Sequence, residues 1–378
     1  MIEIVEKETS GTVIKVVGVG GAGGNAVDHM IREGVQGVEF VCANTDAQAL
    51  KRSLAATKIQ LGGTGLGAGA KPEAGRAAAL EFRERIAEAL AGAHMVFITA
   101  GMGGGTGTGA APVVAEVARE LGILTVAVVT KPFDFENRIR VADSGVEELS
   151  KHVDSLIVVL NDKLMEVYGE EASFVDCFRN ADEVLRKAVG GIAEIINVPG
   201  LVNVDFQDVR TLMAEMGRAM MGSAEAAGLD RARIAAEQAA NSPLLEGVEL
   251  EGARGVLINI TASRSLKMAE VREAVQTVRA FAMEDASVFY GTVFDENMED
   301  RIRITVLATG LGTRRAVARQ PVMQVIKTGT DNVGMEVNYG DLELPAVIRR
   351  PERRTVEAMS ANGFGTYDIP AFLRKQAD

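Results

Sequence analysis

The chain has 378 residues, enough for two globular domains, and its 47% apolar and 24% charged residues are typical of soluble globular proteins. The net charge of −12 argues against nonspecific binding to nucleic acid, and Cys42 and Cys177 have no metal-binding or redox spacing. The first residues lack the pattern of a signal peptide, and no apolar run reaches the ~20 residues that cross a bilayer, so we expect a cytoplasmic protein.

The first half of the chain alternates short β-branched runs with helical segments. Helices are predicted from about Asn25, over Pro72–Ala91 and over Ala110–Leu121. The predicted strands are Val13–Gly20, Val38–Asn44, Met95–Ala100, Leu124–Thr130 and Leu156–Leu160. This alternation predicts a doubly wound α/β fold with a parallel sheet, in which ligands bind at the carboxyl ends of the strands.

A long helix over Phe178–Ile196 follows, with a broad apolar face suited to burial between two domains. A smaller α+β domain is predicted after it. Its strands are Gly255–Thr261, Ser287–Phe294 and Arg301–Thr309, and its helices are Asp230–Ala239 and Leu266–Ala282. Four methionines are expected on one helix, in core or inter-subunit packing: Met213, Met216, Met220 and Met221.

Periodicity fades near Gly312, and a flexible linker is predicted over 313–366. The ending at 367–378 reads as a short helix capped by Asp368, whose Ile369, Phe372 and Leu373 suit docking into a partner's groove. The predicted organisation is a nucleotide-binding domain (1–177), the central helix and its exit (178–202), a C-terminal domain (203–312), the linker and the terminal peptide.

The segment Gly101–Pro112, GMGGGTGTGAAP, lies directly between a predicted strand and a helix. So many glycines let backbone N–H groups converge at the start of a helix, which makes a phosphate-binding loop. Thr106 and Thr108 can add hydroxyl donors. A mobile glycine-rich loop without a ligand is the plainer alternative.

Two further glycine loops, Gly18–Asn25 and Gly62–Gly69, follow earlier strands. The first, with Asp46 after the next strand, is compatible with an NAD-dependent oxidoreductase. Several loops on one sheet edge suit a triphosphate better than a pyrophosphate. No GxxxxGK[ST] motif is present, so the phosphates must be bound by backbone groups and magnesium rather than by a Walker lysine.

These motifs resemble the tubulin/FtsZ superfamily, whose signature is similar to GGGTGTG. The resemblance extends through the segments at 15–27, 44–50, 129–136, 197–213 and 242–246 and the terminal DIPAFLRKQAD. It implies a Rossmann-like GTP-binding domain, a central helix and a smaller C-terminal domain. It also implies a GTPase that polymerises head to tail into the cytokinetic ring of bacterial cell division.

The resemblance implies a role for each matching residue. Phosphates are expected near the glycine loops, the γ-phosphate near Ala68 and Gly69, and the ribose near Glu136 and Arg140. Asn25, Asn161 and Asp182 are expected to read guanine, with Phe178 beside the base. The remaining nucleotide-binding residues that it implies are Gly20, Gly21, Ala22, Asn44, Gly101, Gly103, Gly104, Gly105, Thr106, Gly107 and Thr108. Asn137 stands where the family commonly has Gly, which weakens the assignment of Arg140.

The same resemblance implies that Asp205 and Asp208, with Asn203, complete the catalytic site on a neighbouring subunit's nucleotide. Read from spacing alone, the two aspartates would only cap a helix and complement its dipole. A filament protein that binds GTP without turnover remains a rival hypothesis. His29, His94 and His152 are assigned no chemistry.

The implied cofactors are GTP or GDP, Mg²⁺ held mainly by phosphates and water, and K⁺ as a further candidate. The implied partners are other copies of the chain and, through residues 368–378, membrane tethers and division regulators such as FtsA, at midcell. Neither nucleic acid nor direct membrane insertion is expected.

Overall fold

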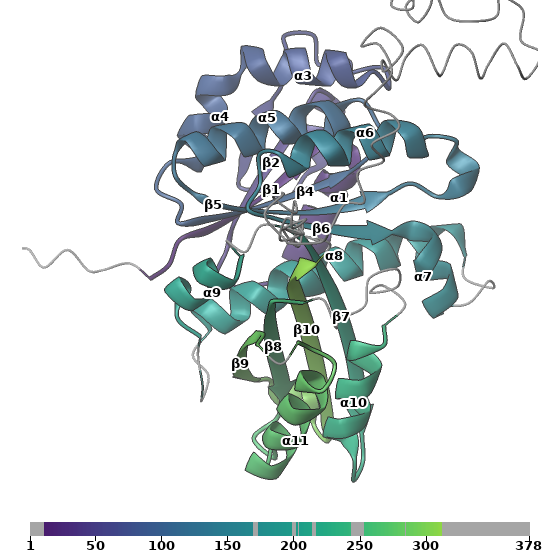
Figure 1. Ribbon diagram of the computed structural model, residues 1–378. Coiled ribbons are helices and arrows are strands. Elements are labelled where there is room, and N and C mark those ends of the chain that lie inside the picture. Colours follow the sequence, from purple (N-terminus) through teal and green to yellow (C-terminus); the bar gives the residue numbers. More distant parts are fainter. Residues whose placement is uncertain are drawn as a thin grey trace, which may run out of the picture. The chain divides into compact units, whose positions relative to one another are not determined.

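The computed structural model describes residues 11–168, 173–198, 202, 204–213, 217–242, 253–283 and 285–311 (Figure 1). The predicted linker and terminal peptide therefore lie outside the described residues. The ten strands form one sheet in the order β3-β2-β1-β4-β5-β6-β7-β10-β8-β9. None of the described helices is both long and apolar enough to cross a membrane.

The first six strands are all parallel, with β1 at the point where the chain reverses its direction of travel across the sheet. Their bounds are β1 Ile14–Val19, β2 Glu39–Asn44, β3 Thr57–Gln60, β4 Met95–Gly101, β5 Leu124–Lys131 and β6 Ser155–Leu160. The order 3-2-1-4-5-6 is that of dinucleotide-binding folds, which have a topological switch point between strands 1 and 4. The predicted parallel α/β fold is confirmed.

Helices cover both faces of these six strands (Figure 1). One face packs on α3 Pro72–Glu81, α4 Arg83–Leu90, α5 Thr106–Glu120 and α6 Ile139–Ser150. The other packs on α1 Gly20–Arg32, α2 Ala47–Arg52, α7 Asn161–Tyr168 and α8 Phe174–Asn197. The single helix predicted over Pro72–Ala91 is two helices, because the backbone turns away from helical geometry at Phe82 (φ −107°, ψ 22°).

Helix α8 is 24 residues long and therefore spans about 36 Å. It begins at Phe174, four residues before the predicted start, because the Ser173 side chain caps it by accepting a hydrogen bond from the Asp176 N–H (3.2 Å). Leu185, Val189 and Ile192 lie on its buried face. The predicted long buried helix is thus present.

The second half of the chain adds four strands to the same sheet. The elements are α9 Phe206–Met213, β7 Gly217–Ala227, α10 Arg231–Ala240, β8 Gly255–Ala262, α11 Met268–Arg279, β9 Ser287–Phe294 and β10 Arg301–Leu311. Strand β10 is antiparallel to β7 and β8, and β8 is parallel to β9. Strand β7 also pairs in parallel with β6, which joins the two halves of the sheet.

The expectation that four methionines share one helix is wrong. Met213 ends α9, whereas Met220 and Met221 belong to β7; Met216 lies outside the described residues. The pairing of Met220 with Ala308 and of Met221 with Leu307 on β10 makes this segment a strand. A partner more than 80 residues away in the chain therefore overrides the local helical spacing.

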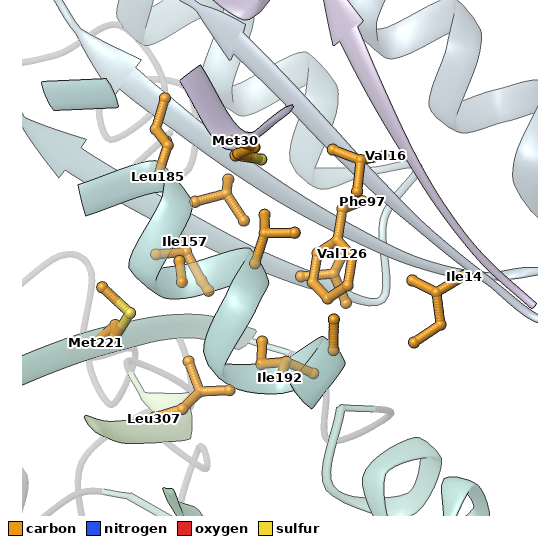
Figure 2. Packing of buried hydrophobic residues seen from close by; sticks show 14 of the residues in the cluster. Ile14, Val16, Met30, Phe97, Val126, Ile157, Leu185, Ile192, Met221 and Leu307 are labelled. Carbon is orange, nitrogen blue, oxygen red and sulfur yellow. The ribbon is translucent and has the colours of Figure 1, made fainter. Parts of the chain in front are cut away.

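The largest core cluster joins both halves through α8. Figure 2 shows Leu185 and Ile192 on this helix, with Val16, Phe97 and Val126 of the first six strands on one side and Met221 and Leu307 on the other. A separate cluster, which includes Ala235, Ile258 and Ile304, packs α10 and α11 on β8 and β10. Helix α8 thus connects the half of the chain that contains the first six strands to the second half.

Candidate functional site

A cavity of about 340 Å³ opens at the switch point between β1 and β4. Its wall comes from the segments after β1, β4, β5 and β6 and from the first half of α8. The lining residues are Val19, Gly21, Ala22, Asn25, Gly101, Met102, Gly104, Gly105, Thr106, Gly107, Thr130, Pro132, Glu136, Arg138, Asn161, Phe178, Ala181, Asp182 and Leu185. The site therefore lies where a fold of this strand order is expected to bind its ligand.

The first glycine segment forms the start of α1 rather than a free loop. The helix begins at Gly20 instead of about Asn25, and no side chain caps it. Gly20 has φ +77°, and a Cβ built there would lie 2.9 Å from the Gly107 amide nitrogen, so only glycine fits. The uncapped N–H groups of this first turn remain available to an anion.

The second glycine segment starts α5 at Thr106, again without a side-chain cap. Its turn is held by the Thr108 hydroxyl, which accepts a hydrogen bond from the Gly103 N–H (2.9 Å). Thr108 is buried and shapes the loop instead of lining the cavity. Thr106 does line it, and the Thr106 hydroxyl lies 2.6 Å from the Thr45 hydroxyl. Two helix N-termini thus open on one cavity, and each is suited to binding an anion.

The third glycine loop supports the second one from behind. A Cβ at Gly105 would lie 2.9 Å from the Ala68 Cβ, and Gly67 donates a hydrogen bond to the Thr45 carbonyl (3.1 Å). Ala68 and Gly69 are not among the lining residues. This loop therefore contacts the glycine segment rather than the cavity itself.

Asp46, the acidic residue that kept a dinucleotide enzyme open, has a local role. Its carboxylate caps α2 by accepting hydrogen bonds from the Gln48 and Ala49 N–H groups (2.8 and 3.2 Å). The Asn44 Oδ1 atom in turn accepts one from the Asp46 N–H (3.2 Å), and Asn44 is buried. Neither residue lines the cavity. Helix capping thus accounts for an acid at this place.

Polar side chains gather at the end of the cavity formed by α1, α7 and α8. Asn161 is buried, and its Oδ1 atom has no hydrogen-bond partner among the described residues. Burial raises the pKa of the Asp182 carboxyl to about 6, although the positive charges of His29 and Arg32 act in the opposite direction. A polar ligand could donate a hydrogen bond to the unpartnered Asn161 Oδ1 atom. It could also stabilise the ionised form of the Asp182 carboxyl, which burial disfavours.

An aromatic wall borders the same end. The Phe178 ring meets Phe133 edge to face at 5.6 Å, and Phe133 stacks on Phe135 at 5.3 Å. Phe178 lines the cavity and remains 39% exposed. Its exposed surface can contact a planar base.

Arg138, rather than the predicted Arg140, lines the cavity beside Glu136. The Asn137 backbone is left-handed (φ +55°), which turns the chain before α6 begins at Ile139 and leaves Arg140 exposed on that helix. Asn adopts this conformation more readily than most non-glycine residues, so Asn137 itself is a sequence signal for this turn. The Arg138 guanidinium lies 3.6 Å from the Glu136 carboxylate.

The structure brings most of the predicted nucleotide-binding residues together. Those in the cavity lining are Gly21, Ala22, Asn25, Gly101, Gly104, Gly105, Thr106, Gly107, Glu136, Asn161, Phe178 and Asp182. Those outside the lining are Gly20, Asn44, Ala68, Gly69, Gly103, Thr108 and Arg140. Sequence reasoning assigned no role to the remaining lining residues, although the segment at 129–136 and the glycine segments contain several of them: Val19, Met102, Thr130, Pro132, Arg138, Ala181 and Leu185.

Asp205 and Asp208 lie near the amino ends of the strands, on the side of the sheet opposite to the carboxyl ends that border the cavity. The Phe206 ring contacts His94 at 6.1 Å, and His94 immediately precedes β4, so this region adjoins the amino ends of the strands. The Asp205 carboxylate caps α9 by accepting a hydrogen bond from the Asp208 N–H (2.8 Å). Asn203 lies outside the described residues. The aspartates are thus separated from the cavity of their own subunit.

The described residues contain no group of three or more His, Cys, Asp or Glu side chains that could hold a metal ion.

Two family descriptions match the chain. Residues 13–169 match "Tubulin/FtsZ family, GTPase domain", and residues 217–312 match "FtsZ family, C-terminal domain". The chain is 52% identical to the cell division protein FtsZ of Pseudomonas putida, with both chains covered completely. It is 53% identical to the FtsZ of Coxiella burnetii, over 99% of each chain.

A solved structure described as an empty FtsZ dimer of M. jannaschii has a TM-score of 0.77 and 44% identity. It covers 80% of this chain, and the match spans 89% of that chain. These relatives do not favour an oxidoreductase.

Proposed function

The chain belongs to the FtsZ family of tubulin-like GTPases, and from that premise we propose that it binds GTP in the cavity between β1 and β4 and hydrolyses it at a site completed by a neighbouring subunit. Head-to-tail stacking of such subunits produces an open filament. The filament acts in bacterial cell division and, in this proposal, forms the ring at midcell.

Guanine is recognised at the α8 end of the cavity. The Asp182 carboxylate accepts from the N1–H and the exocyclic amine, which adenine does not offer in that arrangement. Asn25 and Asn161 contact other polar atoms of the base, and the unpartnered Asn161 Oδ1 supports this assignment. Phe178 packs against the base, while Glu136 and Arg138 lie on the ribose side.

The phosphates lie at the N-termini of α1 and α5, where uncapped N–H groups and the Thr106 hydroxyl can donate to them. Mg²⁺ is held mainly by phosphate oxygens and water and offsets the charge of the reacting phosphate; K⁺ is a further candidate. In this account the chain itself contributes backbone donors and a hydroxyl.

The single observation that carries the shared site is the separation between the cavity and the acidic pair. From Asp182 to the end of α8 at Asn197 the helix rises about 22 Å, and Asp205 follows that end. The cavity adjoins the carboxyl ends of the strands, and Phe206 adjoins their amino ends. Stacking one subunit's amino edge on the next subunit's carboxyl edge would bring the two together.

Asp205 and Asp208 orient and polarise the attacking water in this proposal, with Asn203 assisting. Phosphoryl transfer depends mostly on positioning and charge stabilisation, which two carboxylates can supply. Asp205 also caps α9, so its structural and catalytic roles must be separated. Asp205→Asn retains an oxygen that can accept from the Asp208 N–H, whereas Asp205→Ala does not.

The decisive experiment mixes two inactive variants of the full chain. Asp208→Ala lacks the carboxylate and Asp182→Asn lacks the base reader, so each alone should have little GTPase activity above the assembly threshold. A mixture should recover activity, because one variant's nucleotide meets the other's intact Asp208. Asp205→Asn should keep the wild-type melting temperature and lose turnover.

Activity that is linear in protein from the lowest concentration, or no recovery on mixing, would contradict the shared site. Asp208→Ala that hydrolyses GTP at the wild-type rate would show that this carboxylate has no catalytic role. A wild-type chain that pellets with GTP but does not hydrolyse it would favour the rival filament protein without turnover.

The terminal peptide at 368–378 is proposed to recruit membrane tethers and regulators such as FtsA. Its Ile369, Phe372 and Leu373 would share one side of a helix. Deletion from Tyr367 onward should leave GTP-dependent pelleting intact and abolish cosedimentation of the tether with filaments. Loss of assembly would refute this division of roles between the folded part at 1–312 and the terminal peptide.

A further inference from the structure

His29 and Glu183 join α1 and α8, the helices that carry Asn25 and Asp182, two of the three proposed base-reading residues. The His29 Nε2 atom lies 3.1 Å from the Glu183 carboxylate. His29 follows Asn25 by four residues and so lies on the same side of α1, and Glu183 directly follows Asp182 on α8. Neither His29 nor Glu183 lines the cavity.

Glu183 is a fixed acceptor. Arg186 donates to both of its oxygens, from Nε at 2.7 Å and from Nη2 at 2.6 Å, and the Lys187 Nζ atom lies 3.9 Å away. Burial raises the pKa of the Glu183 carboxyl, but these hydrogen bonds and that of His29 outweigh burial and bring it to about 2. The carboxylate therefore stays charged at neutral pH, and the His29 Nε2 atom is the donor.

Both side chains are largely enclosed, with 12% of His29 and 25% of Glu183 exposed. A charge-assisted hydrogen bond in such a setting has a defined length and direction, unlike an exposed ion pair. One end of this hydrogen bond lies four residues after Asn25 on α1, and the other directly follows Asp182 on α8.

We propose that His29 is a positioning residue for guanine: by donating to Glu183, it sets the separation between Asn25 on α1 and Asp182 on α8. The inference rests on the proposed function, since it assumes that these two residues read the base. Hydrogen bonds weaken steeply when donor and acceptor move apart, so a small shift between the helices is enough to lose discrimination.

The test compares GDP with IDP, which lacks the exocyclic amine, by calorimetric titration of the nucleotide-free full chain. Diphosphates avoid assembly and turnover. His29→Leu should weaken GDP binding by on the order of tenfold and IDP binding much less, so that the preference for GDP falls. His29→Gln, which keeps an N–H donor, should restore the preference, and His152→Leu, at a histidine near Glu148 on α6, should leave it unchanged.

A double-mutant cycle with Asp182→Asn completes the test. If His29 acts through Asp182, the effects of His29→Leu and Asp182→Asn on the preference will not add. Equal weakening of GDP and IDP by His29→Leu, or strict additivity, would mean that His29 only stabilises the fold and would overturn the inference. Unchanged preference in Asp182→Asn alone would instead refute the proposed base reading.

Discussion

Asp182 shows how one side chain can link ligand recognition to pH. Its carboxyl is partly buried among α1 and α8 residues, and that burial raises its pKa to about 6 despite the positive charges of His29 and Arg32. Because the folded-state pKa of Asp182 lies above its ordinary value of 3.8, ionisation of this carboxyl is less favourable in the folded chain than in water. A ligand that donates hydrogen bonds to the carboxylate removes part of this cost.

GDP binding should therefore weaken as the pH falls through about 6. Above that pH the Asp182 carboxylate is already ionised, so the dissociation constant for GDP does not change with pH. Below it the carboxyl must lose its proton before GDP can bind, so the affinity falls by up to about tenfold per pH unit. The measurement is the dissociation constant from pH 5 to 8 for the wild type and for Asp182→Asn.

Both proteins share the titration of the phosphate itself, so the difference between the two profiles isolates the carboxylate. Parallel profiles would show that Asp182 does not titrate with binding.

The stability of the ligand-free chain changes with pH in the opposite direction to the affinity for GDP. A raised carboxyl pKa means that the folded state binds the proton more tightly than the unfolded chain does. Stability from this group therefore declines as pH rises from about 3.8 to about 6 and is level above that range. At neutral pH the ionised Asp182, the proposed base-reading residue, therefore lowers the stability of the ligand-free chain.

At the scale of single elements, the start of α1 determines the shape of the proposed phosphate site, which lies at the N-termini of α1 and α5. The helix begins at Gly20, in a left-handed backbone conformation and against Gly107 of the α5 turn, so the two glycine segments are packed on each other. Thr108 and Thr45 then hold the second segment through hydroxyl hydrogen bonds. The cavity is therefore largely formed before a ligand arrives.

Gly20→Ala and Gly21→Ala, at adjacent positions, should have unequal effects. Alanine at Gly20 would adopt a positive φ and clash with Gly107, which costs about 1–3 kcal/mol. A Cβ at Gly21 meets no atom within 4 Å, and alanine favours the helix by up to about 1 kcal/mol. Chemical denaturation without nucleotide measures both, and equal stabilities would contradict the packed geometry.

At the scale of the whole folded part, α8 and the β6–β7 pairing make the two halves depend on each other. The main core cluster contains side chains of β1, β4 and β5 together with Met221 and Leu307 of the second half, all packed around α8 (Figure 2). The same helix separates the cavity from the acidic pair by a fixed length. Its rigidity therefore serves both stability and the proposed division of the active site between subunits.

Ile192→Ala should destabilise both halves in a single transition. Ile192 is 3% exposed within the shared cluster, and loss of its side chain should cost about 2–5 kcal/mol. Val175→Ala, on the same helix at a position that is 73% exposed, is the control and should change stability little. Amide exchange of β1 and β10 should accelerate together; separate transitions would mean that the halves unfold independently.

Local pattern was enough to predict the parallel sheet, the long helix and the glycine segments of the site. These features depend on periods of two or 3.6 residues and on glycine content, which neighbouring residues encode. The family resemblance added individual site residues, among them Glu136, Phe178 and the proposed base-reading residues Asn25, Asn161 and Asp182. Local pattern left the two aspartates of α9 ambiguous, because a cap and a catalytic carboxylate have the same spacing.

Only the tertiary structure decided the strand β7, the start of α1 at Gly20 and the position of Asp205 near the amino ends of the strands, opposite the cavity. Strand β7 depends on β10, more than 70 residues later, and the first turn of α1 packs against Gly107 of the α5 turn. The distance between the two edges depends on strands and a helix packed side by side. Such relations between residues far apart in the chain leave no periodic trace in the sequence, because they exist only once the elements have packed.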